Sequence, residues 1–265
     1  MRTEDTTLED LTNPGAATDF FTRRTMHPFQ PDQAGFNLAN AVWLMELSRL
    51  VYRRDPSESD PHPTARRTFL EPQGLAEIAF FSRRDSTADT QAILVQPANA
   101  PEWAALVFRG TERNATDVVT DLALSLPLIG SGVIVHRGFR HALDIVWEEI
   151  ERALANVHVP LFMTGHSLGA ALATLAAARH TPRAVYTFGS PLVGNGAFVQ
   201  TLRNVPVHRV VDDIDGVTFV PPPALGYEHA GVEHQLRENP EPPPAWRPAK
   251  IAFDHAPVNY VDRLT

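Results

Sequence analysis

A serine between two glycines is the strongest chemical signal in the chain. Gly165-His166-Ser167-Leu168-Gly169 follows a short apolar run typical of a buried strand and precedes an alanine-rich run, 168–179, typical of a helix. In such a strand–turn–helix arrangement the glycines allow a sharp turn that projects the serine hydroxyl above the sheet. The helix amino terminus behind the turn favours developing negative charge. We therefore predict that Ser167 is a nucleophile.

A serine nucleophile needs a base, and that base needs a carboxylate to orient it. On a sheet-and-helix scaffold of this type, the acid and then the histidine follow the serine along the chain. His255 lies in a predicted loop before the last helix and is the leading candidate for the base, with His229 and His234 as rivals. His180 and His208 fall within predicted regular elements, so we interpret them as structural.

Three carboxylates are candidates for the acid. Asp212, Asp213 and Asp215 all follow the predicted strand 207–211. The carboxyl ends of strands are where sites collect in open α/β sheets. Their positions alone do not separate the three.

A negatively charged oxygen formed at an acyl carbon needs two hydrogen-bond donors. One is the backbone N–H of the residue after the nucleophile, Leu168, and the other comes from a loop after an earlier strand. Thr111 lies in such a loop, directly after the apolar run 104–108, and can offer a backbone N–H and a hydroxyl. An ordinary turn threonine is the alternative interpretation.

The segment 114–122 is predicted to form a short amphipathic helix. Val118, Val119 and Leu122 share one helical face, with Asp117 and Asp121 on another. It is either a surface helix packed on the core or a hinged lid over the nucleophile. In the second case the candidate substrate-binding residues are Ala115, Val118, Val119 and Leu122.

The periodicity of the remaining chain predicts strands alternating with helices. Strands are expected at 76–82, 92–96, 104–108, 160–164, 184–188 and 207–211, and helices at 36–51, 138–156, 168–180, 196–203 and 256–264. This alternation predicts an α/β fold with a mostly parallel sheet covered by helices on both faces. We expect an N-terminal arm over residues 1–32 and a single domain over 33–265, with a functional loop in the proline-rich region 221–248.

Composition excludes several classes of protein. Hydrophobic residues make up 43% and charged residues 20% of the 265 residues, as in soluble globular proteins. The net charge of −8 argues against a nucleic-acid partner, and no apolar run is long enough for stable membrane insertion. Cysteine is absent, which excludes disulfides, thiolate zinc sites and a cysteine nucleophile. The polar N-terminus predicts a non-exported, cytoplasmic protein, and no metal or other cofactor is expected.

Several segments occur in the order typical of one known family. They are Val107-Phe108-Arg109-Gly110-Thr111, Val135-His136-Arg137-Gly138-Phe139, Thr164 to Ala171 around Ser167, Thr187 to Asn195, Gly226-Tyr227-Glu228-His229-Ala230-Gly231 and Asp254-His255. On these segments, residues 36–264 resemble the class 3 lipases, the fungal-type triacylglycerol lipase family of the α/β-hydrolases.

The resemblance implies a role for each candidate. It implies Ser167 as nucleophile, His255 as base and Asp215, six residues after Arg209, as acid. It places Thr111 at the oxyanion position, puts 114–124 on the lid and moves His229 to a flank of the pocket. Residues 216–221 depart from the family's run after the acid, which keeps Asp212 and Asp213 as alternatives.

The resemblance also implies the reaction. The expected activity is hydrolysis of carboxylic esters of acyl lipids, with an acyl ester as substrate, free or at a lipid–water interface. A soluble carboxylesterase, a phospholipase A1 or an acyltransferase would use the same residues. A non-catalytic binding protein on this fold would be expected to lack one of them.

Overall fold

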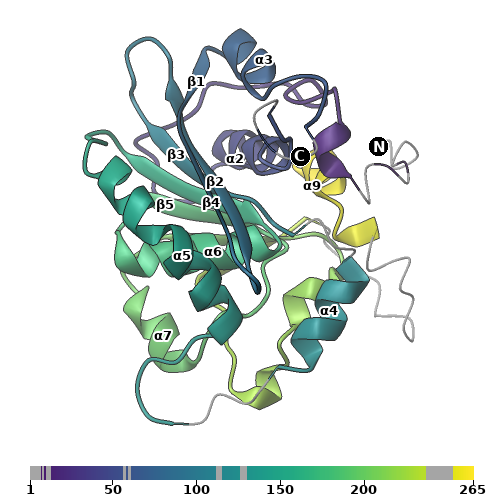
Figure 1. Cartoon of the computed structure of the whole chain (residues 1–265), viewed down its shortest axis with the longest axis vertical. Coiled ribbons are helices and arrows are strands. Elements are labelled where there is room, and N and C mark those ends of the chain that lie inside the picture. Colours follow the sequence, from purple (N-terminus) through teal and green to yellow (C-terminus); the bar gives the residue numbers. More distant parts are fainter. Residues whose placement is uncertain are drawn as a thin grey trace.

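The computed structural model describes residues 13–55, 61–111, 115–125, 130–236 and 253–265, together with Thr7, Glu9 and Glu58. Helices lie on both sides of a central sheet (Figure 1). The α-helices are α2 (Leu38–Leu50), α3 (Arg67–Leu70), α4 (Ala115–Ala123), α5 (Arg137–Leu154), α6 (Leu168–Arg179), α7 (Gly196–Thr201) and α9 (Pro257–Arg263). Short 3-10 helices are η1 (Pro14–Ala16), η2 (Glu71–Gln73), η3 (Gly216–Phe219) and η4 (Pro223–Leu225).

The described residues form a seven-stranded sheet whose spatial order follows the chain. Its strands are β1 (Leu75–Arg84), β2 (Asp89–Pro97), β3 (Ala104–Phe108), β4 (Leu161–His166), β5 (Ala184–Phe188), β6 (Val207–Val211) and β7 (Val232–Gln235). Strands β1 to β3 pair antiparallel, and β3 to β7 pair parallel. The predicted mostly parallel α/β sheet is therefore confirmed.

The strand order explains which helices cover which face. Connections between adjacent parallel strands are right-handed, so a sheet built in chain order receives all its connecting helices on one face. Helices α5, α6 and α7 indeed contribute to one core cluster. The opposite face is covered by α2, which precedes the sheet, and α9, which follows it (Figure 1).

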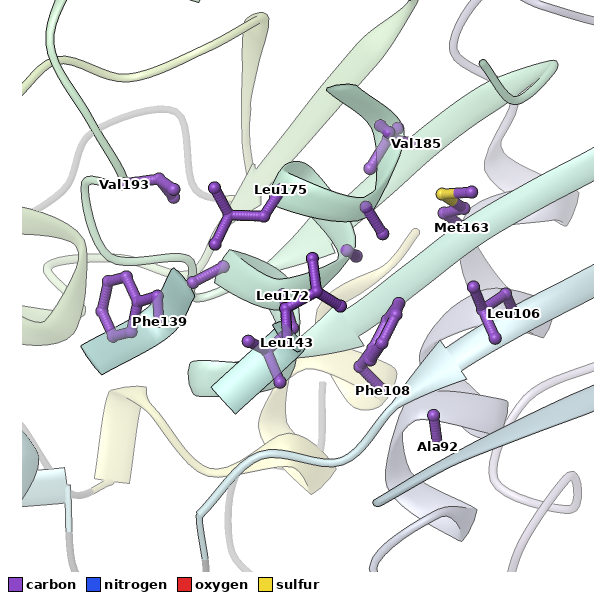
Figure 2. Packing of buried hydrophobic residues seen from close by; sticks show 14 of the residues in the cluster. Ala92, Leu106, Phe108, Phe139, Leu143, Met163, Leu172, Leu175, Val185 and Val193 are labelled. Carbon is purple, nitrogen blue, oxygen red and sulfur yellow. The ribbon is translucent and has the colours of Figure 1, made fainter. Parts of the chain in front are cut away.

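Two apolar cores lie on either side of the sheet. Along β3 the side chains alternate between them: Leu106 and Phe108 belong to one cluster, and Ala105 and Val107 to the other. Figure 2 shows the first core, where Leu143 of α5 and Leu172 of α6 lie near Phe108. Because β3 is buried on both faces, its sequence is a continuous apolar run.

The predicted elements are found with modest differences at their ends. The prediction of a loop over 221–248 is wrong in part, because β7 lies within this range and pairs parallel with β6. Its sequence, Val232-Glu233-His234-Gln235, is mostly polar because an edge strand is held by backbone pairing rather than by burial. Residues 237–248 lie outside the described residues.

The predicted N-terminal arm packs against the rest of the fold from residue 13 onward. Phe20 and Phe21 are almost fully buried, and the Phe21 ring lies 5.6 Å from the Trp43 ring of α2. Arg23 donates to Asp262 of α9. None of the helices in the described part of the chain combines the length and the apolar character needed to cross a membrane.

Candidate active site

Ser167 occupies a strained turn between β4 and α6. Its backbone has φ 60° and ψ −127°, a conformation that costs a non-glycine residue about 1–3 kcal/mol. The Ser167 N–H donates to the Phe188 carbonyl at 3.0 Å, which ties the turn to β5. A Cβ at Gly165 would collide with the backbone of Gly169, so the two glycines of the motif are required by close packing.

Asp215 and His255 come together although 40 residues separate them. His255 Nδ1 donates to Asp215 Oδ2 at 2.7 Å, and both side chains are buried. The same Oδ2 accepts the Tyr260 hydroxyl at 2.7 Å, and Oδ1 accepts the Val217 N–H at 2.9 Å. The carboxylate is therefore held by three donors, two from the C-terminal segment around α9 and one from its own loop.

Asp212 has a different side-chain partner from Asp215. Asp212 pairs with Arg263, and the Asp213 carbonyl accepts from Gln235. Burial raises the pKa of Asp212 to about 7. Asp215, and not Asp212, therefore contacts the leading histidine.

The rival histidines have separate partners. His229 Nε2 donates to the Thr218 carbonyl at 2.8 Å. Burial lowers the pKa of His229 to about 4. His234 Nε2 pairs with His208 Nδ1 at 3.2 Å. Neither bond leads to Asp215, so the geometry favours His255 over both.

Two buried polar atoms of this site have no hydrogen-bond partner among the described residues. They are Ser167 Oγ and His255 Nε2. The two belong to neighbouring parts of the fold, because the ring of His166, the residue before Ser167, lies 4.4 Å from the His255 ring. Unsatisfied buried groups of this kind are rare and cost about 1–3 kcal/mol each. One can donate and the other can accept, as nucleophile and base require.

Gly189 is a site residue to which the sequence assigns no individual role. It follows β5 with φ +59°, and a Cβ there would lie 2.6 Å from Asp215 Oδ2 and 2.9 Å from His255 Nδ1. Only a glycine leaves room for the hydrogen-bonded pair. A glycine directly after a buried strand is the signal that could have identified it.

Tyr52, His166 and Tyr260 are further contributors that sequence reasoning missed. The Tyr260 hydroxyl donates to Asp215 and accepts the Asp212 N–H at 3.2 Å. Burial and the two neighbouring carboxylates hold the Tyr260 pKa well above its ordinary value, so the hydroxyl keeps its proton. A tyrosine five residues after a candidate histidine is too common a pattern to identify this contact.

The predicted oxyanion residues line one cavity of about 630 Å³. Thr111 and Leu168 both contribute to its wall, together with Val118 and Leu122 of α4, the β1–β2 hairpin tip and the start of α5. The structure thus brings together the two oxyanion candidates and two of the lid candidates.

Helix α4 turns its apolar face inward. Val118, Val119 and Leu122 are buried in the same cluster as Val217, and α4 contacts η3. This confirms the amphipathic helix and is compatible with both a packed surface helix and a closed lid. Ala115 begins the helix, but its side chain and residue 114 lie outside the described residues.

Comparison with known proteins shows which family this arrangement resembles. Residues 105–225 match the model of the class 3 lipases. A lipase of Rhizomucor miehei is 32% identical over 169 residues, which make up 57% of this chain and 46% of that protein. Over residues 105–225 the chain is similar to the class 3 lipases.

Two further proteins are similar to this chain. The secreted mono- and diacylglycerol lipase 1 of Fusarium solani is 38% identical over 121 residues, 42% of this chain and 36% of that protein. A solved triacylglycerol lipase whose catalytic centre is a serine protease triad superposes with a TM-score of 0.55 and 29% identity, over 63% of this chain and 69% of that chain. The fold is thus the α/β-hydrolase fold of fungal lipases, although the chain spans less than half the length of the two sequence relatives.

The class 3 lipase match covers only part of the candidate site. Thr111, Ser167 and Asp215 fall within residues 105–225, whereas His255 follows that region. The three-dimensional arrangement, in which His255 donates to Asp215, therefore adds a candidate base from outside the matched region.

Proposed function

We propose that this chain is a serine hydrolase that cleaves carboxylic esters of acyl lipids through an acyl-enzyme. The observation that carries the proposal is the 2.7 Å hydrogen bond between His255 Nδ1 and Asp215 Oδ2, next to an elbow serine whose hydroxyl is buried and unpaired among the described residues. The activities of the relatives, a triacylglycerol lipase and a mono- and diacylglycerol lipase, support acyl lipids as substrates.

Each residue has a defined part in the proposed reaction. Ser167 Oγ attacks the ester carbonyl carbon while His255 Nε2 takes its proton, and Asp215 stabilises the resulting imidazolium through Nδ1. The N–H groups of Thr111 and Leu168 bind the oxyanion. The imidazolium then protonates the departing alkoxide, and the alcohol leaves.

Water completes the proposed cycle. It attacks the acyl-enzyme carbonyl while His255 removes its proton, the Ser167–acyl bond breaks, and the carboxylic acid is released with Ser167 reprotonated. His255 carries every proton transfer, so the mechanism as proposed uses no metal or cofactor.

Exposed apolar side chains next to α4 support contact with a lipid–water interface. Leu124, directly after α4, is 78% exposed, and Phe219 of η3 is 59% exposed. Helix α4 contacts η3. We propose that this part of the surface faces lipid while α4 acts as the lid, with Val118, Val119 and Leu122 as its apolar side.

Replacing the nucleophile tests the proposed function. Ser167→Ala is expected to lower the turnover of p-nitrophenyl butyrate by on the order of 10³-fold or more, because no other group can form the acyl-enzyme. Ser48→Ala is the matched control, since Ser48 is also fully buried but bonds the Leu44 carbonyl in α2. Circular dichroism checks the fold of both variants. An active Ser167→Ala protein would refute the proposal.

A further inference from the structure

Both ring nitrogens of His166 are engaged in hydrogen bonds. Nε2 lies 2.7 Å from the His255 carbonyl oxygen, and Nδ1 lies 3.0 Å from the Tyr52 hydroxyl. A carbonyl oxygen only accepts, so Nε2 carries the proton. A neutral imidazole then has Nδ1 as an acceptor, and Tyr52 must donate to it. The three groups form one directed chain from Tyr52 through His166 to the backbone of His255.

This chain joins three parts of the candidate site. Tyr52 lies just after α2, His166 directly precedes Ser167, and His255 lies just before α9. The Tyr52 hydroxyl also lies against the oxyanion side of the site, because a Cβ at Gly110 would collide with it. His255 is thus fixed at two points, through its ring by Asp215 and through its carbonyl by His166. His255 Nε2, which has no hydrogen-bond partner among the described residues, remains available to Ser167.

The charge state of His166 suits this position. Burial, together with the neighbouring His255, holds the pKa of His166 well below its ordinary value. The two rings are 4.4 Å apart, so a charged His166 would oppose protonation of His255. A neutral His166 allows the base to take up a proton.

We propose that Tyr52 and His166 are positioning residues that set the place of the catalytic base relative to the nucleophile. The inference rests on the proposed roles of Ser167 and His255. Without the Tyr52 hydroxyl, the buried Nδ1 of His166 loses its donor, and the ring is free to adopt the tautomer that cannot bond the His255 carbonyl. A small displacement of a base is costly, since misplacement by about 1 Å can reduce a rate on the order of 10²-fold.

Tyr52→Phe tests the first link of the chain. It is expected to lower kcat for p-nitrophenyl butyrate about 10-fold while KM stays within about twofold, because substrate binding is untouched. Tyr186→Phe is the matched control. Tyr186 is also fully buried, and its hydroxyl donates to the Gly35 carbonyl and accepts the Asn37 N–H, away from the site. Thermal unfolding of both variants measures the structural cost. An unchanged kcat in Tyr52→Phe, or an equal loss in Tyr186→Phe, overturns the proposal.

Variants of His166 test the second link independently. Gln can place an amide N–H near the position of Nε2, whereas Leu fills the space without a donor. We expect His166→Gln to keep kcat at least about 10-fold above His166→Leu, and to react correspondingly faster with a p-nitrophenyl phosphonate that traps the serine. Equal rates for the two variants would reduce His166 to a packing residue. Inactivity of the unmodified protein, or activity of Ser167→Ala, would instead refute the proposed function itself.

Discussion

One oxygen of the Asp215 carboxylate serves two donors. Oδ2 accepts both His255 Nδ1 and the Tyr260 hydroxyl, each at 2.7 Å. A hydrogen bond from tyrosine stabilises the carboxylate charge and so weakens its hold on a protonated imidazole. Tyr260 is thereby expected to tune the pH at which His255 is able to act as a base.

Removing the Tyr260 hydroxyl is expected to shift the pH profile of kcat/KM in a defined direction. In Tyr260→Phe the undivided carboxylate charge stabilises the His255 imidazolium better. The acidic limb of kcat/KM for a soluble ester is expected to move to higher pH by about half a unit. Tyr186→Phe is the control and should leave the limb in place. If the acidic limb of Tyr260→Phe is unchanged or moves to lower pH, Tyr260 contributes only packing.

Single residues differ in how well the sequence predicts them. Ser167 is predictable because its motif is local, and His255 because few loop histidines follow it. Asp215 could not be separated from Asp212 by position, since the choice depends on Arg263 and Tyr260 reaching this loop from α9. Tyr52 and His166 escape prediction because a hydrogen bond across 114 residues leaves no mark in local spacing.

At the scale of elements, the end of β5 leaves no room for a side chain at Gly189 beside Asp215 and His255. Gly189→Ala adds a methyl group against Asp215 and His255, so it is expected to lower kcat on the order of 10²-fold. Gly74→Ala is the matched control, because Gly74 also has a positive φ, +70°, but no atom within 4 Å of an added Cβ. Both variants should lose about 1–2 kcal/mol of unfolding free energy, measured in urea, from backbone strain. Equal kcat values would contradict the proposed crowding.

Elements were predictable where burial dictates their composition. Strand β3 is a continuous apolar run, and its predicted bounds match the structure. Strands β1 and β2 extend beyond the predicted 76–82 and 92–96, because backbone pairing continues through polar residues toward the hairpin tip. Strand β7 went unrecognised because it is paired but largely exposed, with Val232 62% exposed. The sequence thus predicts the extent of a strand only where the strand is buried.

The stability of the whole molecule is expected to depend on a carboxylate that the proposed chemistry does not use. Glu46 of α2 is fully buried, lies 3.1 Å from Arg49, and has its pKa raised to about 7 by burial. Unfolded glutamate titrates near its ordinary value of 4.5. Between these values the folded state binds more protons, so this residue lowers stability as pH rises.

Glu46→Gln removes that dependence because the amide stays neutral. Relative to the unmodified protein, the variant is expected to gain about 3 kcal/mol of unfolding free energy between pH 5 and pH 8. Urea unfolding at the two pH values measures the gap. Glu148→Gln is the control, since the Glu148 side chain is 88% exposed and its variant should show no such change. A gap that is constant with pH would rule out the buried titration.

The ion pair between Arg23 and Asp262 has a consequence for biosynthesis. It joins residues 239 positions apart, so a segment that precedes the sheet in the chain docks on a helix that follows every strand of the sheet. A nascent chain can assemble β1 to β7 as they leave the ribosome. At that stage it still lacks His255, the proposed base, and Asp262, the partner of Arg23. Completion of the site therefore follows assembly of the sheet, and the chain acquires its proposed chemistry only after the helix that contains Asp262 has emerged.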